Sequence, residues 1–247
     1  EGAAHLAEAL RAPGAVPQLR ELRLSQNGVR HEGAACLAEA LRTPGALPQL
    51  QKLDLGKNVV GVKGMARLAV ALQSPGALPQ LQKLDLRWNQ LGHEGAARLA
   101  EALRTPGALP QLQKLDLGGN QVGDVGAARL AEALRTPGAL PQLQQLRLGF
   151  NQVGDEGVAR LAEALRTPGA LPRLKELDLG QNRLGDEGAA HLARALRTLG
   201  ALRRLQKLDL RWNELGDEGA ARLAEALQTP GAAPRLQVLS LYGDRRI

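Results

Sequence analysis

The side chains that could act as nucleophiles, acid–base catalysts or metal ligands are few and lie far apart in the sequence. Cys36 is the sole cysteine, and the histidines are His5, His31, His93 and His191. A catalytic site needs a nucleophile, a base and a stabilising group that converge, and a metal site needs three or four ligands. These positions form no such set, and the chain has neither a phosphate-binding loop nor a dinucleotide-binding glycine motif. We therefore expect a protein that is not an enzyme, with no catalytic residue, no metal site and no cofactor.

The aromatic side chains have the spacing that most clearly indicates a binding surface. The four aromatic residues are Trp88, Phe150, Trp212 and Tyr242, and the first three are separated by 62 residues each. Arg87 and Arg211 directly precede the two tryptophans. Aromatic and arginine side chains are frequent anchors of protein interfaces, and arginine can also stack on aromatic rings. Their regular spacing indicates that a repeated element positions them.

An internal repeat of 31 residues runs through the chain. Each repeat is marked by an asparagine, and Asp244 holds the eighth position. The asparagines are Asn27, Asn58, Asn89, Asn120, Asn151, Asn182 and Asn213. A fixed period of this length indicates a solenoid, in which each repeat packs on its neighbours. The three aromatic residues at 88, 150 and 212 each directly precede an asparagine of this series, two repeats apart. We expect them about 10 Å apart along one edge, given the spacing of parallel strands.

Each repeat has the pattern of one short strand followed by one helix. Leu115 and Leu117 alternate with polar residues, as in a strand with one buried face. The apolar residues at 127, 130, 133 and 134 form one stripe of a helix. Pairs of prolines such as Pro106 and Pro110 end each helix and precede each strand. The segment 198–204 has no proline, and we expect it to be mobile and locally basic.

The string LxxLxLxxN at 112–120 resembles the leucine-rich repeat family, and the following helix resembles its ribonuclease-inhibitor-like subtype. The resemblance implies a single α/β domain over residues 1–247, a right-handed solenoid in the form of a horseshoe arc with about eight repeats. Strands stack at about 4.8 Å and helices at roughly 8–10 Å, so the parallel strands should line the concave side and the helices the convex side. The family's common property is binding, and the fold alone does not specify a partner.

Two further sets of polar residues have expected structural roles. The asparagine amides can donate to and accept from backbone groups of adjacent repeats, and should therefore form a hydrogen-bonded ladder. Before the helices lie Asp124, Asp155, Asp186 and Asp217. Aspartate is a favourable residue at a helix N-terminus, so we expect each one to cap its own helix, with His31 and His93 at the same position in other repeats.

The ends of the chain align with interior parts of the repeat. Glu1 aligns with Glu32, so the chain begins inside a helix, and it stops just beyond the eighth strand. Terminal repeats of solenoids usually carry polar caps. We therefore expect a fragment of a longer array, able to self-associate through its uncapped ends.

Net charge and composition bear on whether the chain binds nucleic acid, crosses a membrane or is secreted. Lys and Arg total 32 against 25 Asp and Glu, giving a net charge of +7. Nucleic acid is an alternative partner but is not expected, because acidic and basic residues mix on the strand face. The sequence contains no run of 18 apolar residues, which is the length that a membrane-spanning helix needs. One unpaired cysteine and no N-glycosylation acceptor favour a cytoplasmic location.

The position between the two core leucines of each strand faces outward and is aspartate in five repeats. Arg147 replaces this aspartate in the fifth repeat, between Asp116 and Asp178. One interpretation is that the charges of this face neutralise one another; the other is a polar docking surface. We expect a protein partner to dock on the concave face, anchored by the four aromatic residues with Arg87, Arg147 and Arg211 supplying charge. The alternative is a structural spacer, in which the rings only cover the edge of the repeats.

Overall fold

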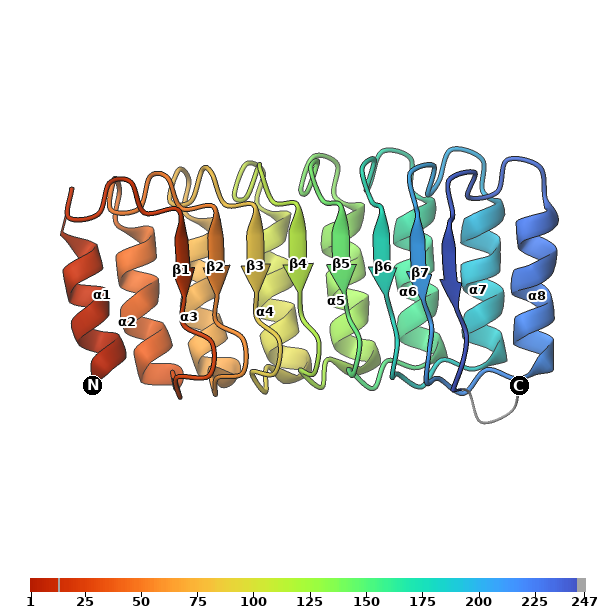
Figure 1. The fold of residues 1–247 in the computed structure, drawn as a ribbon, viewed down its shortest axis with the longest axis horizontal. Coiled ribbons are helices and arrows are strands. Elements are labelled where there is room, and N and C mark those ends of the chain that lie inside the picture. The colour runs from red at the N-terminus through yellow and green to blue at the C-terminus, as the bar shows by residue number, and fades with distance from the viewer. Residues whose placement is uncertain (13, 244–247) are drawn as a thin grey trace.

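Helices and strands alternate along the whole of the chain that the structure, a computed structural model, describes: residues 1–12 and 14–243 (Figure 1). The helices are α1 (Gly2–Arg11), α2 (His31–Arg42), α3 (Gly61–Gln73), α4 (Gly92–Arg104), α5 (Gly123–Arg135), α6 (Asp155–Arg166), α7 (Asp186–Arg197) and α8 (Asp217–Gln228). The strands are β1 (Glu21–Arg23), β2 (Lys52–Asp54), β3 (Lys83–Asp85), β4 (Lys114–Asp116), β5 (Gln145–Arg147), β6 (Glu176–Asp178), β7 (Lys207–Asp209) and β8 (Val238–Ser240).

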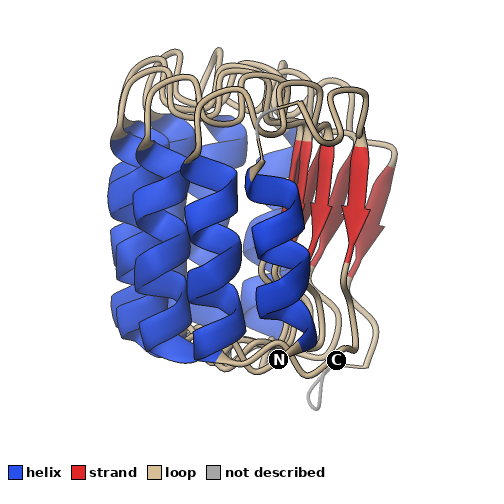
Figure 2. Cartoon of the chain, turned by 90° about the vertical axis from the view of Figure 1, so that its left-hand side faces the viewer, coloured by secondary structure: helices blue, strands red, loops and turns tan. Residues whose placement is uncertain are grey.

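The eight strands form one parallel sheet in sequence order, β1 to β8. The register is the 31-residue repeat itself, so that Leu84 pairs with Leu115 and Leu115 with Leu146. The helices form a second layer on one side of this sheet (Figure 2). The α/β solenoid that the sequence predicts is confirmed. Within the described residues, no helix has the length and apolar character needed to cross a bilayer.

The core lies between these two layers and consists almost entirely of leucine and alanine. Leu115 and Leu117 are fully buried beneath the sheet, as their alternation with polar residues predicts. The stripe of α5 that contains Leu130 and Leu134 packs against them and is also buried. Because small alanines separate the leucines, neighbouring helices pack closely without any aromatic side chain. All four aromatic residues are exposed outside this core.

The asparagine series links each repeat to the one before it. The Oδ1 atom of Asn151 accepts hydrogen bonds from the backbone N–H groups of Asn120 (2.9 Å) and Val122 (3.3 Å). Its Nδ2 atom donates to the carbonyls of Leu117 and Leu148, each at 3.0 Å. Asn58, Asn89, Asn120, Asn182 and Asn213 are likewise buried, whereas Asp244 lies outside the described residues. Backbone groups that stacking removes from water thereby find partners.

Three of the four aspartates expected to cap their own helices cap the next helix instead, so the sequence-based expectation was wrong. Asp155 Oδ1 accepts from the N–H groups of Gly185 (2.7 Å) and Gly188 (2.9 Å), at the start of α7. Asp124 and Asp186 make the same pair of bonds to the starts of α6 and α8. Each of these aspartates is the first or second residue of its own helix, so the capping position of that helix lies one or two residues earlier.

The conformation of the glycine that starts each helix follows from this cap. Gly154, which donates to an aspartate of the preceding repeat, has an extended backbone with φ −97°. For Gly61, the residue of the preceding repeat in the aspartate column is His31, which supplies no carboxylate. Gly61 adopts φ +62° and donates to the carbonyl of Asn89 instead. His31 itself is the first residue of α2, with its imidazole beside Glu32.

Asp155→Ala should lower the free energy of unfolding by about 1–2 kcal/mol, as the loss of a helix cap does. The substitution leaves two N–H groups of α7 without their acceptor. Asp217→Ala is the matched control: Asp217 has the same sequence context but is exposed and accepts no hydrogen bond from the described residues. Urea unfolding followed by circular dichroism measures both. An equal loss of unfolding free energy in the two variants would show that the hydrogen bonds between repeats do not contribute to stability.

Candidate functional site: a groove of aromatic and glutamine side chains

The residue before each asparagine of the series has a left-handed backbone, in aromatic and non-aromatic repeats alike. The φ angles are +55° at Trp88, +61° at Phe150 and +57° at Trp212. Bulky residues rarely adopt this conformation, which costs about 1–2 kcal/mol relative to the ordinary helical one. Two repeats carry glycine here, Gly119 and Gly243, where the cost disappears. Aromatic side chains at the other positions are therefore not explained by backbone preference.

Trp88 and Phe150 contact each other although two repeats separate them in sequence. Their ring centroids are 5.3 Å apart with an interplanar angle of 54°. The expected separation of about 10 Å was therefore wrong for this pair. The cause is Gly119, in the repeat between them: a Cβ atom there would lie 2.4 Å from the Trp88 ring, so only glycine lets the indole lie across that repeat. The rings remain about half exposed, 45% for Trp88 and 47% for Phe150.

Three glutamines line a groove next to this aromatic pair. Gln90, Gln121 and Gln152 directly follow asparagines of the ladder, are exposed, and have φ angles of +56° to +57°. Their amides make no hydrogen bond to any described residue, so their donors and acceptors face solvent. The groove has a volume of about 760 Å³, and its other lining residues are Lys57, Asn58, Trp88, Gly119, Phe150, Gln181, Asn182 and Arg183.

The glutamines are the part of the groove that the sequence analysis missed. The signal was available, since Asn-Gln recurs at the 31-residue period in three consecutive repeats. The strand pattern ends before these residues, however, and neither periodicity nor composition indicates where a side chain beyond the strand points. The structure places this column and the aromatic column along the same edge of the molecule.

Trp212 and Tyr242 belong to a second cluster, nearer the C-terminus. The Trp212 ring lies over Gly243, where an added Cβ would be 2.6 Å from the ring. The guanidinium of Arg211 lies 5.1 Å from the centre of the Tyr242 ring and donates to the Tyr242 hydroxyl. Arg211 also donates to the buried carboxylate of Asp209 at 2.7 Å. Hydrogen bonds to Asp209 and Tyr242 raise the pKa of Arg211, so this side chain stays charged and fixed in position.

Arg147 and Arg87 are held by carboxylates of the strand face. The Arg147 guanidinium lies 3.1 Å from Glu176 Oε1 and 3.7 Å from Asp116 Oδ2, so it bridges both neighbouring strands. Arg87 Nε is 3.4 Å from Asp85 Oδ2. Both side chains therefore neutralise local carboxylates, although part of each remains exposed to solvent.

The aspartates of the strand face are largely buried, which distinguishes them from a solvated charged stripe. Asp116 and Asp209 are almost inaccessible, and each accepts a hydrogen bond from the N–H two residues later. Burial raises the pKa of the Asp85 and Asp178 carboxyls, partly offset by the same type of backbone hydrogen bond. Burial, followed by the nearby Arg147, lowers the pKa of Lys114. These carboxylates stabilise the turns that follow the strands more than they present charge to a partner.

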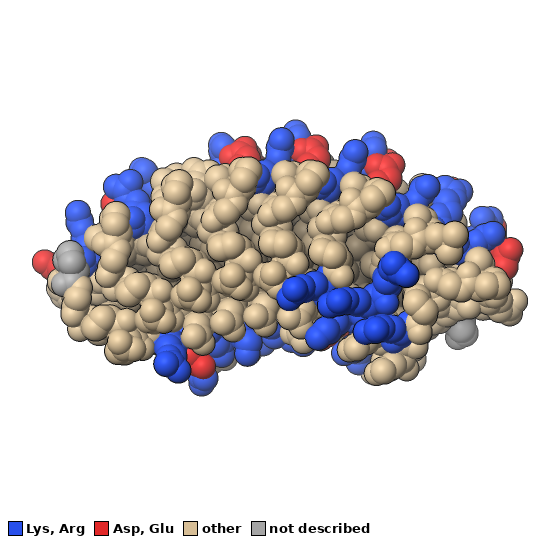
Figure 3. Space-filling model, turned by 90° about the horizontal axis from the view of Figure 1, so that it is seen from above, with Lys and Arg blue, Asp and Glu red and all other residues tan. Residues whose placement is uncertain are grey.

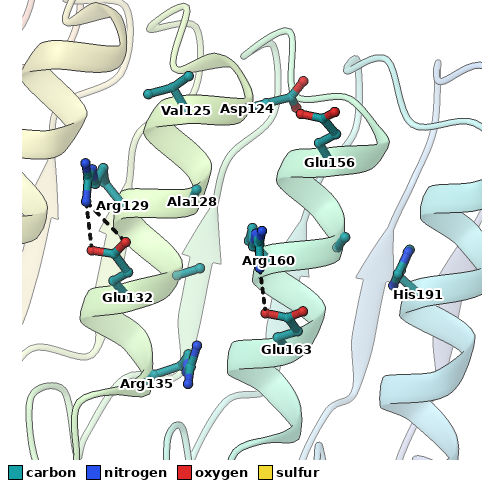
Figure 4. A pocket seen from close by; sticks show the side chains of 12 residues that line it. Asp124, Val125, Ala128, Arg129, Glu132, Arg135, Glu156, Arg160, Glu163 and His191 are labelled. Carbon is teal, nitrogen blue, oxygen red and sulfur yellow. Dashed lines mark hydrogen bonds and ion pairs between the residues drawn. The ribbon is translucent and has the colours of Figure 1, made fainter.

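A larger hollow of about 870 Å³ lies on the helix side, between α5 and α6 (Figure 4). Four of its charged side chains pair along their own helices: Arg129 with Glu132 at 3.2 Å, and Arg160 with Glu163 at 3.4 Å. Exposed pairs of this kind contribute little to stability, and this hollow has no aromatic anchor. No group of three His, Cys, Asp or Glu residues within residues 1–12 and 14–243 is arranged to hold a metal ion. The groove at the strand ends is the better candidate.

Gly119→Ala should separate the Trp88 and Phe150 rings. Gly107→Ala is the matched control, because Gly107 has nearly the same φ, +73°, but nothing within 4 Å of an added Cβ. Both variants carry the backbone cost, and only Gly119→Ala also displaces the indole. We expect Gly119→Ala to be less stable than Gly107→Ala by about 1 kcal/mol, the worth of an aromatic pair. Urea unfolding and tryptophan emission measure this difference; identical values would mean that the ring contact is not maintained in solution.

A match to a protein-family model agrees with the repeat architecture. The family model described as "Leucine Rich repeat" matches residues 17–38, 47–69, 78–100, 109–131, 140–162, 171–193 and 202–224, together more than half of the chain. A comparison with curated proteins gives no significant match. Among solved structures, one titled "Leiomodin-1 Actin-Binding Site 2 (ABS2)" is similar at 14% identity and a TM-score of 0.47, covering 60% of this chain and 78% of that one. The protein belongs to the leucine-rich repeat family.

Proposed function

We propose that this chain is a non-catalytic protein-recognition module whose main docking surface is the aromatic and glutamine groove. One observation carries the proposal: two half-exposed rings, on backbone positions that disfavour bulky residues, line a groove beside three solvent-facing glutamines. Backbone strain and exposed aromatic rings both cost stability without improving the core. Such features occur together mainly at functional sites. Family membership supports protein binding in general.

The groove fits an extended peptide or a protein loop with one apolar side chain. The tilted Trp88 and Phe150 rings offer an apolar contact for that side chain, as interface hot spots do. Each glutamine amide offers both a donor and an acceptor, matching the N–H and C=O groups of a peptide backbone. Gln90, Gln121 and Gln152 recur at the spacing of the repeats and could each contact a different part of such a backbone.

We propose that the same partner extends along the strand side toward Trp212 and Tyr242. The third, fifth and seventh repeats each contribute one arginine to this path, namely Arg87, Arg147 and Arg211. Their carboxylate contacts fix them in place, so they contribute orientation and polar complementarity rather than free charge. In this proposal the aromatic residues dominate the binding energy, and the arginines act at the rim of the interface.

The test is to select peptides from a random displayed library on the immobilised protein and to measure their affinity by titration. Trp88→Ala and Phe150→Ala should each weaken binding at least about thirtyfold, close to 2 kcal/mol, as hot-spot truncations do. Val125→Ala is the control, because Val125 is an exposed apolar residue on α5, outside the groove. Peptides that bind all three variants equally would contradict the proposal.

The spacer alternative gives a different result in the same experiment. If the rings only cover the edge of the repeats, the library yields no specific peptide, and both ring variants lose stability without any binding phenotype. A nucleic-acid ligand would instead show affinity that falls steeply with salt concentration. Urea unfolding of each variant separates a loss of binding from a loss of folding.

A further inference from the structure

A cluster of basic side chains lies at the opposite end of the strands from the groove. Its members, which we call the basic edge, are Arg173, Lys175, Arg203, Arg204 and Arg235. They lie in the loops that lead into β6, β7 and β8. Arg173, Arg203, Arg204 and Arg235 are exposed, and Lys175 is partly exposed. Viewed from this end, the C-terminal half carries a group of Lys and Arg side chains with no Asp or Glu among them (Figure 3).

The basic edge departs from the rest of the repeat. Arg173, Arg204 and Arg235 occupy one column of the 31-residue period. The first five repeats all have glutamine in this column: Gln18, Gln49, Gln80, Gln111 and Gln142. Arg203 stands where the other repeats have proline, in the segment 198–204 that the sequence marked as locally basic. The change from neutral to basic is therefore abrupt and confined to three consecutive repeats.

Stacking brings the backbones of these residues close together, and no carboxylate of the described residues pairs with their charges. The backbone N–H of Gln206 donates to the carbonyl of Lys175, and that of Gln237 donates to Gln206, each at 2.8 Å, so the loops continue the register of the sheet. Equivalent residues of neighbouring repeats are then about 5 Å apart at the backbone. Among the described residues, no carboxylate lies within 4 Å of a cationic group of the basic edge. Glu176, the nearest in sequence, contacts Arg147 and Lys207 instead.

A ladder of like charges at this spacing is unfavourable unless a counter-charge is present. Arginine predominates here, and its planar guanidinium binds carboxylates through two parallel hydrogen bonds. An exposed leucine, Leu199, at 81% exposure, lies in the same proline-free loop. It adds one exposed apolar side chain to the segment that also contains Arg203 and Arg204. These features together fit a ligand that is polymeric, rich in carboxylates and able to present a side chain to Leu199.

We propose that the basic edge binds an acidic polypeptide segment, at a surface separate from the aromatic and glutamine groove. Single-stranded nucleic acid is disfavoured because it binds through stacked aromatic side chains, and all four aromatic residues lie at the other end of the strands. A membrane surface is disfavoured because Leu199 is the one large exposed apolar residue of this loop, and peripheral binding scales with the apolar area inserted. The assignment does not depend on the function proposed for the groove.

The repeat supplies the variant that tests this assignment. In the triple variant Arg173→Gln, Arg204→Gln, Arg235→Gln, each arginine becomes the residue that five other repeats have in the same column. The probe is a fluorescein-labelled octaglutamate peptide, titrated by anisotropy at about 20 mM salt, where charges are weakly screened. The dissociation constant should rise at least about tenfold in the triple variant.

A second triple variant, Arg104→Gln, Arg135→Gln, Arg166→Gln, is the matched control. It removes the same number of charges from exposed helix ends, in a column where Gln73 and Gln228 occur naturally. This variant should bind octaglutamate as the unmodified protein does, and so should Trp88→Ala. Equal weakening by both triple variants would overturn the proposal, because net charge alone would then explain binding.

Two other ligands complete the experiment. An oligothymidine strand and vesicles containing phosphatidylserine are titrated at the same salt concentration. Tighter binding of either one than of octaglutamate, lost in the triple variant of the basic edge, would reassign the surface to that class of ligand. No octaglutamate binding by the unmodified protein would also overturn the proposal. Circular dichroism of both triple variants confirms that they are folded.

Discussion

Asn151→Ala should lower the free energy of unfolding by about 3–5 kcal/mol, because it leaves several buried backbone groups without partners. Asn151 has no accessible surface. Its amide accepts from two N–H groups of the preceding repeat and donates to the carbonyls of Leu117, Leu148 and Gly149. Water cannot replace these partners easily, since the site lies between two stacked repeats. Urea unfolding followed by circular dichroism measures the loss.

The same column provides the control for this prediction. Asn27 is exposed, and its Nδ2 atom donates to the carbonyl of Ser25 in its own repeat. Asn27→Ala should therefore change stability by less than about 1 kcal/mol, the net worth of one exposed hydrogen bond. A similar loss in the two variants would mean that the asparagine acts within its own turn rather than between repeats.

Leu130→Ala should cost about 2–5 kcal/mol through the cavity that it leaves in the core. Leu130 is buried on the inner face of α5, among leucines and alanines that cannot expand to fill the space. Because each repeat packs only on its neighbours, the effect should be greatest on α4 and α6. Hydrogen exchange of the amides, measured helix by helix, tests this distribution.

Leu199→Ala is the control for the core substitution, since Leu199 is the most exposed of the large apolar residues described. It should change stability by no more than about 0.5 kcal/mol, as surface substitutions usually do. An unchanged melting temperature in Leu130→Ala would contradict the assignment of the apolar helix face.

The architecture could be predicted from the sequence because every level of the repeat indicates the same structure. Three patterns indicate the same strand-and-helix repeat: the alternation of leucines at 115 and 117, the apolar stripe around Leu130, and the asparagine period. The stacking of repeats follows from the period. Lateral contacts between repeats could not be predicted in the same way. The caps are an example: whether Asp155 reaches α7 or its own helix depends on the offset between adjacent repeats, which no spacing within one repeat specifies.

The candidate site was predictable only in part for the same reason. The aromatic residues were correctly placed outside the core, since they occur in no position of the leucine and alanine pattern. The contact between Trp88 and Phe150 depends on Gly119 in the intervening repeat, so it involves three repeats at once. The exposed glutamines lie in a turn with left-handed backbone angles, and the sequence pattern does not predict where side chains in this turn point. The resemblance to the ribonuclease-inhibitor-like subtype, and the use of the concave face by a partner, stay predictions.

The aspartate caps make the coupling between repeats uneven along the solenoid. Each capped helix takes its acceptor from the repeat before it, so unfolding of either of the two repeats breaks the bonds that join them. This coupling exists for α6, α7 and α8, whereas the glycines that begin α3, α4 and α5 donate to a backbone carbonyl instead. In a nearest-neighbour description of folding, the interface free energies are then unequal along the array. The C-terminal half, where these caps add to the interfaces, should therefore open in larger units than the N-terminal half.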